Sequence, residues 1–112
     1  MKFSESLKKN IEFKNVYNNG KSLADKNIVM YVLKNNLNKN RIGISVSKKV
    51  GNSVVRHHMT RIFREIYRIN EENFEVGFDI VIICRNKALY TKFKNLVESY
   101  INLAKLHGIY KQ

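Results

Sequence analysis

Positive charge is concentrated between Arg41 and Arg68. This stretch holds seven lysines and arginines against one acid, Glu65, while the whole chain holds 21 against 9 and has a net charge of +12. Lysine outnumbers arginine 15 to 6 in the chain, so a lysine-rich codon supply explains part of the charge. Residues 56–68 nevertheless hold four of the six arginines: Arg56, Arg61, Arg64 and Arg68. Because the planar guanidinium group pairs with phosphate and stacks on bases, this stretch predicts a nucleic-acid surface.

The spacing in this stretch predicts one helix over residues 53–70 with an apolar and a cationic face. Apolar side chains recur in steps of three and four: Val55, Met59, Ile62, Phe63, Ile66 and Ile69. A cationic stripe repeats every four residues, with His57 and Arg61 beside it: Arg56, Thr60, Arg64 and Arg68. Lys48 and Lys49 precede the helix start, where Asn52 or Ser53 provides a cap and free N–H groups favour anions. We expect phosphate binding here; an ordinary solvated basic face is the alternative.

The remaining pattern predicts an α+β sandwich in a single domain, residues 1–112. Three helices are expected from their apolar faces: residues 5–18, 53–70 and 91–106. Three strands are expected from alternating or continuous apolar runs: residues 28–34, 41–47 and 78–85. A further short strand before residue 28 is an open alternative; counting it, the order is α-β-β-β-α-β-α, a central sheet with helices packed on it. Ile11, Ile69 and Phe93 are among the side chains expected to face inward.

Several classes of protein are disfavoured by composition. The chain has no run of roughly 18 apolar residues for a membrane span and no secretory signal at its start, so a cytoplasmic protein without a membrane partner is expected. The single cysteine, Cys84, cannot form an internal disulfide and is interpreted as a buried apolar side chain. The acids show no paired spacing, and His57, His58 and His107 lack companions for a metal site. A self-sufficient nuclease is therefore disfavoured.

The run from Gly43 to Glu65, GISVSKKVGNSVVRHHMTRIFRE, resembles the protein subunit of bacterial ribonuclease P. That family's motif reads approximately VSKKVGNAVxRNRxKRxxRE and aligns here without a gap. The resemblance extends to the segment from Leu7 to Tyr17, the turn Gly20-x-Ser22, the strand containing Val29-x-Tyr31 and the late apolar strand. Three positions depart from the motif: His57 and His58 replace Asn and Arg, and Thr60 replaces Lys. Two cationic positions are thereby weakened, because histidine is mostly neutral at pH 7.

The resemblance implies both a mechanism and an unusual topology. In this family the protein is a noncatalytic monomer within a ribonucleoprotein endonuclease; it binds the RNA subunit, which performs the chemistry with Mg²⁺, and the 5′ leader of precursor tRNA. The family also has a left-handed β-α-β crossover, against the usual right-handed rule. By motif position the implied contacts with the RNA subunit are Lys48, Lys49, Asn52, Arg56, His57, His58, Thr60, Arg61, Arg64 and Arg68. The implied leader cleft is lined by Phe13, Tyr17, Val29, Tyr31 and Ser45.

No cofactor bound by the protein itself is expected. A stand-alone RNA-binding or ribosome-associated accessory protein is the alternative function, and the motif from Ser45 to Glu65 favours ribonuclease P over it.

Overall fold

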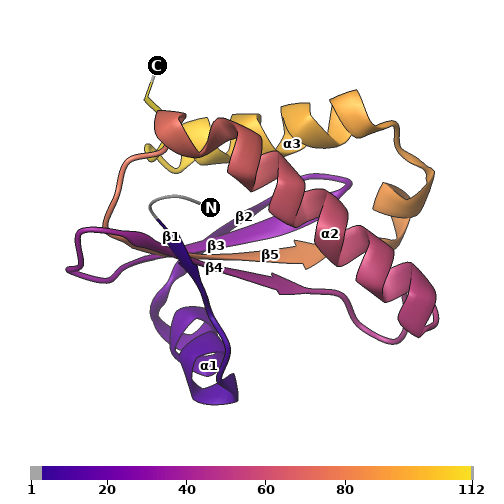
Figure 1. Cartoon of the computed structure of the whole chain (residues 1–112), viewed down its shortest axis with the longest axis horizontal. Helices are drawn as coiled ribbons and strands as arrows, with labels where there is room; N and C mark the ends of the chain where they lie inside the picture. Colours follow the sequence, from indigo (N-terminus) through magenta and orange to yellow (C-terminus); the bar gives the residue numbers. More distant parts are fainter. Residues whose placement is uncertain (1–3, 112) are drawn as a thin grey trace.

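A five-stranded mixed sheet forms the centre of the computed structural model, which describes residues 4–111 (Figure 1). In chain order its strands are β1 (Ser4–Ser6), β2 (Lys21–Ala24), β3 (Ile28–Lys34), β4 (Asn40–Ser45) and β5 (Phe78–Cys84). The helices are α1 (Asn10–Asn19), α2 (Ser53–Asn70) and α3 (Phe93–Leu106), with short 3-10 helices η1 (Glu71–Asn73) and η2 (Asn86–Tyr90). The predicted α+β class and the short strand before residue 28 are both confirmed.

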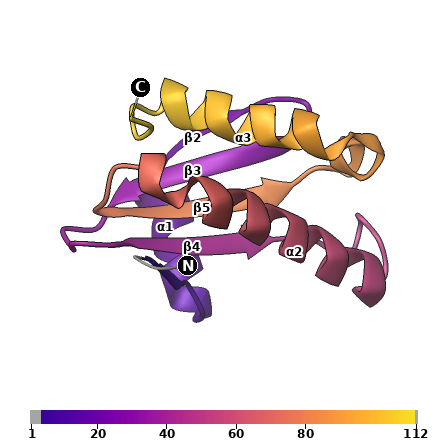
Figure 2. The ribbon, with the colours of Figure 1, turned by 45° about the horizontal axis from the view of Figure 1, so that its top comes forward.

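The strands are arranged in the order β1-β4-β5-β3-β2. β4 is parallel to both of its neighbours, β1 and β5, whereas β3 is antiparallel to β5 and β2. Helix α2 connects β4 to β5 and therefore makes a β-α-β crossover. In Figures 1 and 2 both strands run to the right, α2 lies on the viewer's side and β5 lies above β4, so the crossover is left-handed, as the resemblance implied.

The two faces of the sheet are covered unequally. Helices α2 and α3 lie together on one face, whereas α1 alone lies on the other (Figures 1 and 2). Alternate side chains of β3 and β5, such as Met30 and Ile82, are fully buried under α2 and α3 in the main core. On the α1 side a smaller cluster forms around Leu7, Val16 and Val81. Because period-two alternation sends neighbouring residues to opposite faces, half of each strand lies on this thinly covered side.

The predicted first helix is wrong at its start. Residues Ser4–Ser6 form β1, which pairs in parallel with residues 40–42 of β4, and the Leu7 N–H donates to the carbonyl of Ile42 at 2.9 Å. The helix begins only at Asn10, where Glu12 Oε1 accepts the N–H groups of Lys8 and Lys9, each at 3.0 Å. A three-residue strand held by backbone hydrogen bonds leaves no apolar periodicity in the sequence, so the pattern does not distinguish it from the helix that follows.

Three side chains expected to face inward are exposed instead. Ile11 is 73% exposed, Ile69 51% and Phe93 46%. All three lie within one or two residues of the start or end of their helices. The strands of β4 and β5 also end earlier than predicted, at Ser45 and Cys84, and α3 begins at Phe93 rather than at residue 91.

His107 connects the end of α3 to the sheet and makes stability depend on pH. Its Nε2 donates to the carbonyl of Met30 at 3.0 Å, and burial lowers the pKa of His107 below its usual value near 6.5. The unfolded chain then binds more protons than the folded protein below about pH 6.5, so stability is lost as pH falls through that range. We expect His107→Gln, which keeps a donor but does not titrate, to show a smaller drop in Tm between pH 7.5 and 5.5 than wild type. Equal drops in both proteins would contradict this.

Candidate nucleic-acid interface

Half of the predicted basic residues lie on one exposed side of α2, which we call its crest. The helix is capped by Asn52, whose Oδ1 accepts the Val55 N–H at 3.0 Å, so this oxygen is engaged within the protein. Four basic residues on the crest are exposed: His57, Arg61, Arg64 and Arg68. Among the described residues, Arg61 and Arg64 form no ion pair. Their guanidinium groups are therefore available to an external anion.

Arg68 differs because it already has a carboxylate partner. Its Nε and Nη2 donate to the two oxygens of Glu65 at 2.8 and 2.6 Å. Both side chains are about half exposed, and a surface pair of this kind contributes little to stability. A phosphate could displace Glu65 at small cost, but Arg68 presents less free charge than Arg61 or Arg64.

The other two residues of the predicted stripe lie on a less exposed side of α2. Arg56 and Thr60 are half-buried, and the Thr60 hydroxyl donates to the carbonyl of Arg56 at 2.9 Å. The predicted single stripe is corrected here, because Phe63 and Tyr67 share this side of the helix and are fully buried. Arg56 Nε is also buried and has no hydrogen-bond partner within residues 4–111.

The loop before α2 presents two further cations. Lys48 and Lys49 are exposed on a turn, while Val50 next to them is buried and its N–H donates to the carbonyl of Ser47 at 3.1 Å. At Gly51 a Cβ atom would lie 2.8 Å from Cγ1 of Val55, so the loop can pack this closely only because residue 51 has no side chain. The anchored turn holds both lysines beside the helix start, as the sequence predicted.

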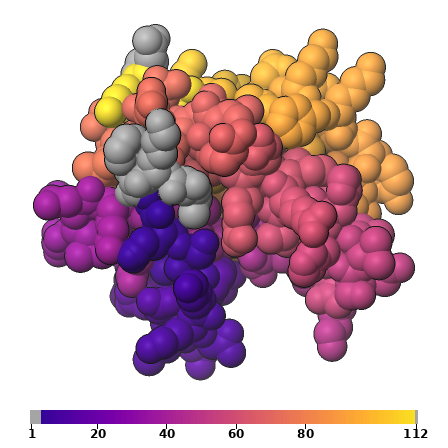
Figure 3. Space-filling view, in the orientation of Figure 1, coloured from indigo at the N-terminus to yellow at the C-terminus, as the bar shows by residue number. Residues whose placement is uncertain are grey.

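On the opposite side of the sheet, an aromatic row leads from α1 onto β3. The ring centroids of Phe13 and Tyr17 are 6.4 Å apart, and those of Tyr17 and Tyr31 are 5.1 Å apart in an edge-on arrangement. All three side chains are half-buried, so each presents part of its ring to solvent. Figure 3 shows a hollow between the indigo surface of α1 and the pink surface at the start of α2.

The strand register extends this surface across the sheet. Val29 and Ser45 both pair with Ile83 of β5, which places them on the same face and about 10 Å apart across two strand spacings. Tyr31 and Gly43 likewise both pair with Val81, one row closer to α1. The five residues predicted for the cleft therefore share one face of the sheet, and all are half-buried: Phe13, Tyr17, Val29, Tyr31 and Ser45.

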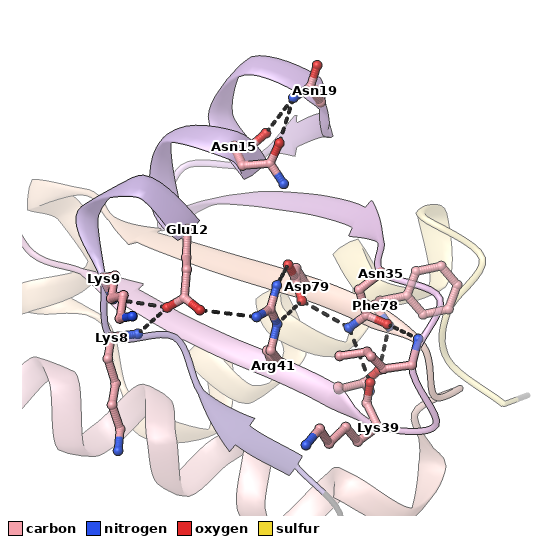
Figure 4. Close-up of polar contacts among 12 residues, drawn as sticks. Lys8, Lys9, Glu12, Asn15, Asn19, Asn35, Lys39, Arg41, Phe78 and Asp79 are labelled. Carbon is pink, nitrogen blue, oxygen red and sulfur yellow. Dashed lines mark hydrogen bonds and ion pairs between the residues drawn. The ribbon is translucent and has the colours of Figure 1, made fainter.

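A polar network that sequence reasoning missed fixes α1 against this face (Figure 4). Arg41 donates to both oxygens of the buried Asp79, at 2.8 and 2.7 Å, and to Glu12 Oε2 of α1 at 3.1 Å. Asp79 also accepts from Asn35 Nδ2 at 2.9 Å. The side-chain hydrogen bonds to Asp79 raise the pKa of Arg41, so its charge persists. The only signal in the sequence was an acid inside an otherwise apolar strand.

Gly43 allows the Phe13 ring to lie directly on the sheet. A Cβ atom at this position would lie 2.6 Å from Cε1 of Phe13 and 3.1 Å from Cδ1 of Leu7. We expect Gly43→Ala to push the ring off the sheet and to destabilise the protein by about 1–3 kcal/mol, as overpacking does. Urea unfolding would measure this, with Ser45→Ala on the same face of β4 as the control. A loss below about 0.5 kcal/mol, the range of ordinary surface changes, would show that Phe13 is free to move away.

Other chemistry finds little support within residues 4–111. No three His, Cys, Asp or Glu side chains converge there to hold a metal ion. Burial raises the pKa of the Cys84 thiol to about 11, so this sulfur stays protonated, in line with a packing role. None of the helices in this part of the chain is long and apolar enough to cross a membrane.

Comparison with known proteins gives consistent matches. A family model described as Ribonuclease P matches residues 1–107. The ribonuclease P protein component of Lachnoclostridium phytofermentans is 54% identical over 106 residues, covering 95% of this chain and 91% of the relative. That of Clostridium novyi is 47% identical over 112 residues, covering 98% and 99%. The solved RNase P protein of Staphylococcus aureus has a TM-score of 0.86 at 31% identity, covering 94% and 96%, and that of Thermotoga maritima 0.84 at 33%, covering 90% and 96%.

Proposed function

The chain belongs to the ribonuclease P protein component family, and from this we propose that it binds the RNA subunit of a ribonuclease P and the 5′ leader of precursor tRNA. Family membership makes it a component of an endoribonuclease that acts in tRNA 5′ processing. The proposed holoenzyme is a cytoplasmic ribonucleoprotein with one copy of this chain. Its RNA subunit supplies the Mg²⁺-dependent chemistry, and the protein positions the two RNAs.

We assign the RNA subunit to the loop and crest of α2. The observation that supports this most directly is the pair Arg61 and Arg64, exposed on a rigid helix without an acidic partner among the described residues. Exposed guanidinium groups without an acidic partner can form bidentate, charge-assisted hydrogen bonds with phosphates. Lys48 and Lys49 extend the charge to the helix start. Because His57, His58 and Thr60 replace residues of the family motif, binding of the RNA subunit relies mainly on the arginines.

We assign the single-stranded leader to the half-buried aromatic face. Phe13, Tyr17 and Tyr31 offer ring surface to unstacked bases, and such stacking is tolerant of sequence. This face and the crest of α2 belong to opposite layers of the fold (Figure 1). The two RNAs can therefore be bound at the same time, on surfaces that mutations can separate.

A reconstitution assay tests the proposal. The purified protein is mixed with a bacterial ribonuclease P RNA and precursor tRNA at low Mg²⁺. We expect faster 5′ cleavage than with RNA alone; no stimulation would refute the proposal. A mutant of the Staphylococcus aureus relative is described as defective in mRNA degradation activity, so the protein alone is also incubated with precursor tRNA and mRNA. Cleavage of precursor tRNA at the same site without the RNA subunit would instead support a self-sufficient nuclease.

Two variants test the division of surfaces. Arg64→Ala should weaken binding of the RNA subunit, whereas Tyr17→Ala should mainly weaken leader binding, measured as the affinity gained when precursor tRNA carries a leader. Lys105→Ala on α3 and Ile11→Ala on the outer side of α1 are exposed controls. Equal effects of both variants on both RNAs would contradict the division.

A further inference from the structure

An apolar groove runs along the side of α2 that faces away from the half-buried aromatic face. It lies between the N-terminal half of α2 and the corner formed by η2 and the start of α3, and has a volume of about 500 Å³. We call it the α2–α3 groove; the following residues are among those that line it: Val54, His58, Met59, Ile62, Leu89 and Phe93. In Figure 3 the pink surface of α2 meets the orange surface of this corner on the right.

Two apolar side chains at the groove are exposed. Val54 is 75% exposed and Phe93 46%, and His58 is exposed as well. Phe93 takes part in none of the ring pairs within residues 4–111. Phe93 and His58 thus place two rings at one groove, and the Phe93 ring pairs with no other aromatic ring in the described part of the chain. This arrangement suits a flat, partly apolar ligand.

Cations border the groove. Residues 85–94, which form the corner, contain four lysines and arginines and no acid, and Arg61 of α2 is exposed on the other side. Lys87, Lys92 and Lys94 join no ion pair in the described part of the chain. A shallow depression lined by His57, His58 and Arg61 adjoins the groove at Val54 and continues onto the crest of α2. An anionic backbone carrying flat bases complements this combination better than an apolar peptide does.

We propose that the α2–α3 groove binds an unstacked nucleobase of the RNA subunit, whose flanking phosphates lie on the crest of α2 and on the start of α3. The proposal rests on the function proposed above and extends the RNA-binding surface to a second helix. It also gives the ring of His58 a role, since an imidazole can stack on a base where the arginine of the family motif would pair with phosphate.

Binding measurements with the full chain and the RNA subunit provide the first test. Phe93→Ala and His58→Ala should each weaken binding by about 5- to 100-fold, the range for losing one stacked base. The slope of log affinity against log salt should stay unchanged, because no phosphate contact is removed. Leu106→Ala, an exposed apolar side chain at the far end of α3, is the matched control and should bind as wild type. Thermal melts check that each variant is folded.

A crosslinking experiment identifies the occupant directly. Val54→Cys is labelled with an aryl azide, which is selective because Cys84 is buried. We expect crosslinks to bases at one site of the RNA subunit, and none at that site from labelled Leu106→Cys. Crosslinks from position 54 only to a second protein chain would overturn the proposal.

The two proposals fail in different ways. If wild-type protein does not bind the RNA subunit, the proposed function itself is wrong. If wild type binds but Phe93→Ala and His58→Ala both bind within about twofold of it, only the groove is wrong.

Discussion

Replacing Arg61 and Arg64 together with alanine should weaken binding of the RNA subunit by about 100-fold at moderate salt. Each hydrogen bond to a charged group contributes roughly 1.5–3 kcal/mol, and about 1.4 kcal/mol corresponds to a factor of ten. Both side chains are exposed on the rigid crest of α2 and form no ion pair within residues 4–111, so the substitutions remove no internal contact of that kind. Stability should therefore change by less than about 0.5 kcal/mol.

The salt dependence distinguishes phosphate contacts from a general loss of charge. Each phosphate contact contributes about 0.7–0.9 to the slope of log affinity against log salt, so the double variant should lose about 1.5. The control is the double lysine variant, Arg61→Lys with Arg64→Lys. It should restore the slope but only part of the affinity, because lysine cannot form the bidentate fork. If alanine and wild type share one slope, phosphates do not bind at this crest.

Local patterns explain why α2 and its loop could be predicted from the sequence. The bounds Ser53–Asn70 were correct because a cap residue, an apolar stripe and a cationic face coincide within a single element. The strands β3 and β5 were also close, since each is a continuous apolar run bounded by polar residues. These signals depend only on neighbours in the chain.

The features that were missed depend on partners far along the chain. β1 exists only because its backbone pairs with residues 40–42. The contacts between Arg41 and Asp79 span 38 residues, and no local pattern connects these two side chains. The exposure of Phe93 likewise follows from where α3 begins relative to α2. The helical periodicity of α3 gives no information about that relative position. Sequence therefore located the cationic element better than the geometry of the surfaces around it.

The half-buried aromatic face adjoins a network of three charged side chains on the same side of the sheet. Arg41 joins β4 to Asp79 of β5 and to Glu12 in the first turn of α1 (Figure 4). Asp79 is 1% exposed, so its carboxylate relies on Arg41 and Asn35 in place of water. Only one helix covers this side of the sheet, and the network is its main polar attachment. Loss of Arg41 should therefore affect both stability and the position of Phe13.

Arg41→Met should destabilise the protein by about 3 kcal/mol, at the lower end of the cost of breaking a buried ion pair, since a quarter of the arginine side chain is exposed. Asp79→Leu should cost less, because Arg41 keeps Glu12 and some contact with water. The double variant should be more stable than the sum of the single losses predicts, by at least about 1 kcal/mol, since it leaves no charge uncompensated. Urea unfolding of all four proteins measures this coupling.

The same four proteins test whether this network supports leader binding at the half-buried aromatic face. In Arg41→Met, release of Glu12 should loosen α1, so leader affinity should fall. Affinity for the RNA subunit, which we propose binds on α2, should stay within about twofold of wild type. The fall should be measured well below the unfolding temperature of each variant. Additive stability losses in the double variant would show that Arg41 and Asp79 act independently. Unchanged leader affinity in a destabilised Arg41→Met would show that the apolar contacts of α1 alone hold the helix in place.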